Sequence, residues 1–321
     1  MKKLLTALLS LCITDACAED EPPPYTSKSY KYLLLADGTA KITAYTGKIK
    51  KLTVPETLDG HAVTAIGDNA FSGCMSLTSV VIPDSVTDIG DSAFYHCMSP
   101  KSVTIGNGVT TIGDEAFFGC DKLTSIVIPD SVTSIGANPF EDCTALTDIR
   151  VSSEHPTLAV IDGVLFDKTE KKLICYPSAL TADSYTIPQD IQVIGDSAFS
   201  RCSLTSITIP DSVTTIGSWA FSSCQSLTSI AIPSSVTAIG DKAFSGCYSL
   251  TSITIPDSVT TIGEYAFSGC LTLTSVTIPD SVTTIGDGVF CNYYALTHIT
   301  VTPGSYAEQY CKDNDLPYIS K

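Results

Sequence analysis

The stretch LTSITIPDSVTTIGEYAFSGC, residues 250–270, decides the fold because close copies of it recur through most of the chain. The cysteine that ends each copy returns every 23 residues, at Cys74, Cys97, Cys120 and Cys143 and again at Cys224, Cys247 and Cys270. A fixed period of about 20 to 29 residues is typical of a solenoid, in which each repeat forms one coil of a stack. We therefore predict a repeat solenoid rather than the two globular domains that 321 residues would otherwise suggest.

Apolar residues within one repeat follow neither a helical nor a strand period. In the copy that ends at Cys97 they are Leu77, Val80, Ile82, Val86, Ile89, Ala93 and Phe94. Such uneven spacing indicates a chain that turns corners, with a proline that ends one short strand and a glycine at the next corner. We predict β-rich stacked coils of about 23 residues with single helical turns around AlaPhe. The acid after the glycine, such as Asp91 or Asp241, is expected to cap that turn.

Composition and charge narrow the classes of protein. Hydrophobic residues make up 44% of the chain and charged residues 16%, which favours an ordered core. The net charge of −16 repels nucleic acid, so no nucleic-acid partner is expected. Residues 1–18 have the layout of a secretory signal peptide, cleaved near Ala18, and no later segment reaches the ~20 apolar residues of a transmembrane helix. We predict a secreted or cell-surface protein.

The regular period stops at both ends and in the middle of the chain. Residues 30–45 predict a β-hairpin that turns at Asp37 and Gly38, and residues 304–315 predict a short helix, so that both ends of the solenoid are capped. The middle contains a hairpin-like turn at 167–172 between apolar strands, which we interpret as one expanded coil with an outward loop. Such a loop is either a place for binding or a tolerated insertion. The predicted organisation is a signal peptide (1–18), a linker (19–29), an N-terminal cap with a degenerate first repeat (30–67), repeats (68–151), an expanded irregular repeat (152–186), repeats (187–302) and a C-terminal cap (303–321).

Four motifs together carry a family resemblance. They are SITIPDSVTTIGEYAFSGC at 252–270, IDGVLFD at 161–167, LADGTAKIT at 35–43 and PGSYAEQY at 303–310. On these motifs the chain resembles the BspA-type leucine-rich repeat family of secreted and cell-surface proteins. The resemblance implies a leucine-rich-repeat-like solenoid and a role in adhesion, including attachment to extracellular-matrix proteins or to other microbes. It implies no catalytic residues and no cofactor.

Residues that could carry chemistry have simpler structural interpretations. The cysteine column could form disulfides, but a parallel stack points its side chains the same way, which favours buried free thiols. The sequence has no CysXxxXxxCys pair of the kind that binds zinc. Aspartates such as Asp84 and Asp257 follow the prolines, but each coil supplies only one such carboxylate, whereas Ca²⁺ needs several oxygen ligands at one point. A role in forming the turn explains these aspartates better. The four histidines lie in distant repeats. We predict no metal, no cofactor and no enzymatic activity.

Binding is the function that the repeat pattern leaves open. Large residues stand at four positions that are polar in most repeats: Trp219, Tyr248, Tyr265 and Leu271. The outward positions of the predicted strands form a column of hydroxyls that includes Thr205, Thr228, Thr251 and Thr274. Exposed aromatic residues on a rigid scaffold are typical interaction hot spots. We predict a monomeric adhesion or protein-binding scaffold with an extracellular protein as ligand, and the alternative is a glycan or nutrient capture protein that uses the same aromatic residues.

Overall fold

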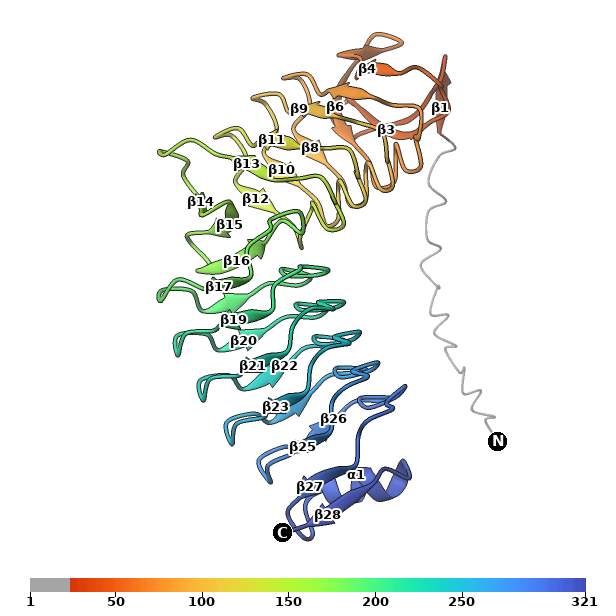
Figure 1. Cartoon of the computed structure of the whole chain (residues 1–321). Helices are drawn as coiled ribbons and strands as arrows, with labels where there is room; N and C mark the ends of the chain where they lie inside the picture. The colour runs from red at the N-terminus through yellow and green to blue at the C-terminus, as the bar shows by residue number, and fades with distance from the viewer. Residues whose placement is uncertain (1–23) are drawn as a thin grey trace, which may run out of the picture.

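The chain forms one elongated stack of parallel coils (Figure 1). The computed structural model describes residues 24–321, so the predicted signal peptide lies outside the described residues. Successive coils pair in register with the sequence period, as in Ser252 with Ser275 and Ile253 with Val276. The predicted repeat solenoid is confirmed.

Each regular coil contributes one strand to each of two walls. The first wall consists of three sheets, β4-β7-β9, β11-β13 and β17-β19-β21-β23-β25-β27-β28. Their bounds are β4 (Lys51–Thr53), β7 (Ser79–Val81), β9 (Ser102–Thr104), β11 (Ser125–Val127), β13 (Asp148–Arg150), β17 (Ser184–Thr186), β19 (Ser206–Thr208), β21 (Ser229–Ala231), β23 (Ser252–Thr254), β25 (Ser275–Thr277), β27 (His298–Val301) and β28 (Tyr318–Ser320). Proline follows most of these strands closely and ends them, because it has no N–H for the next ladder bond.

The second wall is built in the regular coils from two-residue strands that follow the corner after the proline. Its members are β3 (Ala40–Tyr45), β6 (His61–Ile66), β8 (Asp88–Ile89), β10 (Thr111–Ile112), β12 (Ser134–Ile135), β16 (Lys172–Cys175), β18 (Val193–Ile194), β20 (Thr215–Ile216), β22 (Ala238–Ile239), β24 (Thr261–Ile262) and β26 (Thr284–Ile285). The longer strands β3, β6 and β16 belong to the N-terminal and expanded coils. One sheet continues through β12 and another starts again with β14-β15-β16. Both walls are therefore interrupted at the expanded coil.

The third side, which we call the turn wall, consists of the segment from each corner glycine to the cysteine, such as residues 263–270. Alternate N–H groups here donate to the next coil, as Trp219 does to the Asp241 carbonyl at 2.8 Å and Phe221 to the Ala243 carbonyl at 2.8 Å. The intervening N–H groups donate to carbonyls three residues back, as Ser222 does to Trp219. This side of the solenoid is thus also tied together by backbone bonds between coils.

The acid after the corner glycine acts differently from our expectation. The sequence predicts that it caps its own turn, whereas Asp91 Oδ1 accepts from the backbone N–H of Asp114 at 2.8 Å, one coil further on. Asp241 Oδ1 accepts from the N–H of Glu264 in the same way, also at 2.8 Å. The parallel stack brings that N–H nearer than any in the residue's own turn. The acid therefore links coils.

The interior is filled by stacked columns of identical side chains. One column of phenylalanines runs through most coils with nearly parallel rings, for example 4.9 Å between Phe71 and Phe94 and 5.1 Å between Phe221 and Phe244. Isoleucine and valine form the adjoining columns, which are buried except for partly buried members such as Ile135. Close-packed aromatic rings add stacking to the burial of apolar area. Because each ring is covered only by its neighbours above and below, the coils stabilise one another.

The N-terminal end is closed by an antiparallel meander of β1 (Tyr25–Ser27), β2 (Tyr30–Leu34) and β3, and β5 (Thr57–Leu58) pairs with β6. The predicted hairpin at Asp37 and Gly38 is confirmed as the β2–β3 turn. Strand β1 lies inside the segment 19–29 that we expected to be a linker. The Tyr25 ring stacks on the Tyr32 ring, with centres 5.4 Å apart. A strand of three residues is too short for its pattern to be recognised in the sequence.

The C-terminal end is closed by α1 (Tyr306–Asp313), which confirms the predicted helix. Ser305 caps it, since its hydroxyl accepts from the N–H of Glu308 at 3.2 Å. The chain then forms β28, which pairs in parallel with β27 and extends the first wall by one strand. The buried face of α1, with Ala307, Tyr310 and Cys311, covers the last coil.

The expanded coil is a partition rather than an outward loop. Strands β14 (Leu158–Ile161) and β15 (Val164–Asp167) form an antiparallel meander with β16. Alternate residues of a strand face opposite sides. Leu165 and Ile174 pack into the N-terminal core, whereas Phe166 and Leu173 pack into the C-terminal core. The predicted hairpin turn at 167–172 is confirmed as the connection between β15 and β16. The predicted outward loop is wrong for the strands themselves, because their apolar side chains are buried on both faces, between the two halves (Figure 1).

Candidate functional site on the turn wall

Trp219, Lys242 and Tyr265 occupy the same repeat position, the one before AlaPhe, in three successive coils. Lys242 Nζ lies 4.0 Å from the centre of the Trp219 ring and 5.7 Å from that of Tyr265. Both rings are exposed, with 41% and 39% of their surface accessible. Two of the predicted binding residues are thus brought together, with a cation between them.

The backbone at this position has a conformation that favours glycine. The φ angles of Trp219, Lys242 and Tyr265 are 59°, 53° and 54°, and Gly288 in the next coil has 61°. A left-handed conformation costs a bulky L residue about 1–2 kcal/mol. The same repeat position is left-handed in other coils too, at Asn69, Ser92, Glu115 and Ser197. The conformation therefore belongs to the repeat, and the aromatic side chains of Trp219 and Tyr265 are what distinguishes this site.

Tyr248 and Leu271 form a second pair in a different column, the position after the cysteine. Tyr248 is exposed, Leu271 is half-buried, and the carbonyl of Tyr248 accepts from the Thr272 hydroxyl at 2.8 Å. This column lies where the turn wall passes into the first wall. The four large residues therefore form two separate columns.

The threonine column is exposed but has a structural task. The hydroxyl of Thr228 donates to the carbonyl of Thr205 at 3.2 Å, and that of Thr251 to the carbonyl of Thr228 at 3.2 Å. Thr205 and Thr274 make equivalent bonds to the preceding coil. Since each hydroxyl hydrogen is already used, a ligand meets only acceptor capacity here, which weakens the column as a recognition surface.

A hollow of about 220 Å³ adjoins Trp219 and was not predicted from the sequence. It lies where the coil that carries Glu141 contacts the coil that carries Arg201 on the turn wall. These two coils are separated in the sequence by the expanded coil. Arg201 forms an ion pair of 3.2 Å with Asp142, and the Ser200 hydroxyl donates to Glu141 at 2.7 Å. The lining residues are Tyr95, Glu115, Phe118, Glu141, Ser197, Arg201 and Trp219.

The hollow combines stacked aromatic rings with charge. The Tyr95 ring stacks on Phe118 at 4.7 Å. Burial, and next the neighbouring Glu141, raises the pKa of Glu115 above its ordinary value. We call these lining residues together with Lys242 and Tyr265 the turn-wall site. Aromatic faces beside carboxylates and a guanidinium suit a protein surface that presents both apolar and basic side chains.

Some residues of the turn-wall site could have been recognised in the sequence, because they replace the usual residue of their repeat position. Lys242 stands in the same repeat position as Trp219, and Tyr95 and Phe118 replace the serine of the regular AlaPheSerGlyCys segment. The proximity of Glu141 and Arg201 could not have been recognised, because they belong to coils separated in the sequence by the expanded coil. No repeat period pairs residues across an irregular insertion.

The cysteine column is formed by thiols that behave as small apolar side chains. The described cysteines are unpaired, and all eight in the column are buried except the half-buried Cys74. Most of the buried thiols donate to a phenylalanine carbonyl of a preceding coil, as Cys247 Sγ does to the Phe221 oxygen at 3.1 Å, whereas Cys202 Sγ lies 3.2 Å from Cys224 Sγ. Burial raises the pKa of Cys270, which disfavours the reactive thiolate.

Among residues 24–321, no group of three or more His, Cys, Asp or Glu side chains is placed to hold a metal ion. No helix in the same range has the length and apolar character needed to cross a bilayer.

Comparisons with other proteins agree on the fold and the family. The model of the BspA type leucine rich repeat region matches residues 64–185 and 174–297, with six copies. A leucine rich cell surface protein from Faecalibacterium prausnitzii is 32% identical, with 91% of this chain and 98% of that chain covered and a TM-score of 0.64. A leucine-rich repeat protein from Eubacterium ventriosum is 27% identical, with 86% of each chain covered and a TM-score of 0.62. The comparison with curated proteins gives no match. The chain belongs to the BspA-type leucine-rich repeat family.

Proposed function

We propose that this protein is a secreted or cell-surface adhesion scaffold that binds an extracellular protein through the turn-wall site. The proposal rests above all on the stack of Trp219, Lys242 and Tyr265, in which two exposed aromatic rings lie on either side of a lysine ammonium group. The name of the Faecalibacterium relative, a cell surface protein, supports the location. The role is binding rather than catalysis.

The arrangement of the site suits attachment to a broad protein surface. The walls behind it are tied coil to coil by backbone bonds, so little conformational entropy is lost when a partner docks. Aromatic side chains and arginine carry most of the binding energy in protein interfaces. The turn-wall site offers Trp219, Tyr265, Tyr95 and Arg201 along one side of the solenoid.

The proposal is tested by binding of the purified full chain to a panel of immobilised extracellular-matrix proteins and to cells of other microbes. We expect saturable binding to at least one of them. Trp219→Asn and Tyr265→Asn should each weaken it by about tenfold or more, as loss of a hot-spot aromatic residue does. Asparagine is chosen because it tolerates positive φ, as Asn69 does at 57° in the same repeat position.

Tyr294→Asn is the matched control, because Tyr294 is 83% exposed and lies outside the turn-wall site. It should bind as the unchanged protein does. Equal binding by Trp219→Asn, Tyr265→Asn and the control would contradict the placement of the site. Absence of saturable binding to every member of the panel would contradict the adhesion function itself.

A further inference from the structure

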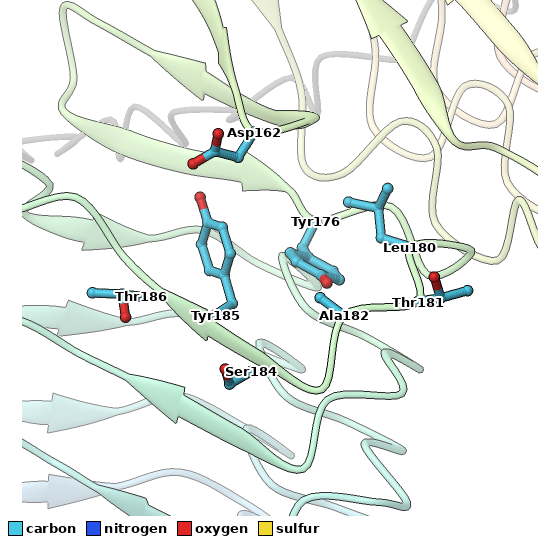
Figure 2. A pocket seen from close by; sticks show the side chains of 8 residues that line it. All are labelled: Asp162, Tyr176, Leu180, Thr181, Ala182, Ser184, Tyr185 and Thr186. Carbon is cyan, nitrogen blue, oxygen red and sulfur yellow. The ribbon is translucent and has the colours of Figure 1, made fainter.

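A cavity of about 500 Å³ lies in the expanded coil, where the first wall is interrupted. Strand β17 starts a new sheet there and pairs only with β19 among the described strands, so its other edge is open. The cavity is bounded by this strand, by the segment 180–182 and by the tip of the β14–β15 hairpin, which carries Asp162 (Figure 2).

Two tyrosines form the aromatic part of the cavity. The rings of Tyr176 and Tyr185 meet edge to face, with centres 5.3 Å apart. Tyr176 is 2% exposed, and neither hydroxyl has a hydrogen-bond partner among residues 24–321. The hydroxyl of Tyr185 points toward the carboxylate of Asp162 (Figure 2). Buried hydroxyls without partners are unfavourable, so a ligand that supplies partners gains from them.

The chemistry of the lining selects one class of ligand. Asp162 is its one charged residue, and the chain carries a net charge of −16, so anions are excluded. The tyrosine rings and Leu180 offer apolar surface, while Thr181 and Ser184 add hydroxyls to those of the tyrosines. Burial raises the pKa of Tyr176 to about 12, which keeps its hydroxyl protonated as a donor at neutral pH.

We propose that this cavity binds one unit of a neutral saccharide, of the size of a hexose or an N-acetylhexosamine. Its C–H face packs against the partly exposed Tyr185 ring and Leu180, and its hydroxyls bond to Asp162, to Ser184 and to the Tyr185 hydroxyl. The volume lies within the range of small-molecule sites. Saccharide recognition is thereby assigned to the expanded coil and not to Trp219 and Tyr265, so it is independent of the protein-binding function proposed above.

The test is saturation-transfer-difference NMR on the full chain, titrated with the methyl glycosides of glucose, galactose, mannose and N-acetylglucosamine. At least one should give a saturable signal. Tyr185→Phe and Asp162→Asn, which remove single polar groups, should each weaken its binding about 3- to 10-fold. Ala182→Phe fills the cavity from an exposed position and should abolish binding, while circular dichroism reports whether the fold is kept.

Tyr294→Phe, on an exposed tyrosine of the last regular coil, should bind the same glycoside unchanged. The proposal is overturned if no glycoside binds saturably, or if Tyr185→Phe and Asp162→Asn both bind like the unchanged chain. It is also overturned if the open edge of β17 takes up a short extended peptide while every glycoside fails to bind. Loss of binding in Trp219→Asn would likewise contradict the assignment to the expanded coil.

Discussion

At the scale of single residues, a parallel stack turns many side chains into links between coils. Threonine hydroxyls, acid carboxylates and thiols each bond to the backbone of a neighbouring coil, as Thr228, Asp241 and Cys247 do. The residues at these repeat positions are polar or small because their side chains bond to the backbone of the neighbouring coil. The positions where a large side chain replaces the usual one, such as Trp219, are then the ones free to serve recognition.

The acid column gives a prediction at this scale. Asp241→Ala removes the acceptor for the N–H of Glu264 and should lower the free energy of unfolding by about 1 kcal/mol, the usual cost of losing a backbone cap. The measurement is chemical denaturation followed by circular dichroism.

Two variants serve as controls for the acid column. Asp241→Asn keeps the acceptor oxygen and should remain close to the unchanged protein. Asp287 is the last acid of the column, and its carboxylate has no hydrogen bond or ion pair within the described chain, so Asp287→Ala should cost less than half as much. Equal losses at both positions would show that the inter-coil bond contributes nothing.

At the scale of elements, the C-terminal cap depends on one carboxylate. Glu308 accepts from the N–H of Gly304 at 2.9 Å and from the Ser320 hydroxyl at 2.8 Å, and it pairs with Lys312 at 3.2 Å. It therefore ties α1 to the preceding loop and to β28. The same bonds, first the one from Gly304, lower its pKa to about 2.

This pKa gives a prediction for the cap. Because the folded-state pKa lies below the ordinary value of 4.5, the folded cap binds fewer protons than the unfolded cap. Its stabilisation is complete above about pH 4.5 and is lost as the pH falls through about 2. The protection of residues 304–320 against hydrogen exchange, corrected for the intrinsic pH dependence of the exchange rate, should fall over this window. In Glu308→Gln this protection should already be lower at pH 6 and should change less on acidification. An identical pH response of the protection in both proteins would refute the role of Glu308.

At the scale of the whole molecule, the meander β14-β15-β16 divides the solenoid into two cores. Neighbouring residues of β15 serve different halves, since Leu165 belongs to the N-terminal core and Phe166 to the C-terminal core. Side-chain links between the halves include the Arg201–Asp142 ion pair and the bond from the Asn138 amide to the Ser197 carbonyl at 2.7 Å. We therefore expect the two halves to unfold as separate cooperative units.

Two adjacent substitutions test this division. Leu165→Ala should increase hydrogen exchange mainly in residues 68–151, and Phe166→Ala mainly in residues 187–302. Each should cost about 2–5 kcal/mol in its own half, as large-to-small changes in a core do. Mass spectrometry of exchanged peptides measures both halves at once. If either variant loosens both halves equally, the solenoid is one cooperative unit.

The period of the sequence by itself determined the stack, its three sides and most of the core, because apolar residues that recur every 23 positions are buried only by neighbouring coils. Both caps could be predicted because each has a local sequence pattern. The N-terminal cap has a turn sequence at Asp37 and Gly38, and the C-terminal cap has a helix pattern near residue 306. The partition was not predicted, although the consecutive apolar residues of 164–166 and 173–175 are typical of strands buried on both faces. Which two cores these faces join is not specified by the run itself. Only the tertiary structure brought Glu141 beside Ser200, placed Lys242 between two rings and left the edge of β17 open. These features depend on which distant segments meet across an irregular coil, and a repeat period specifies only contacts between successive repeats.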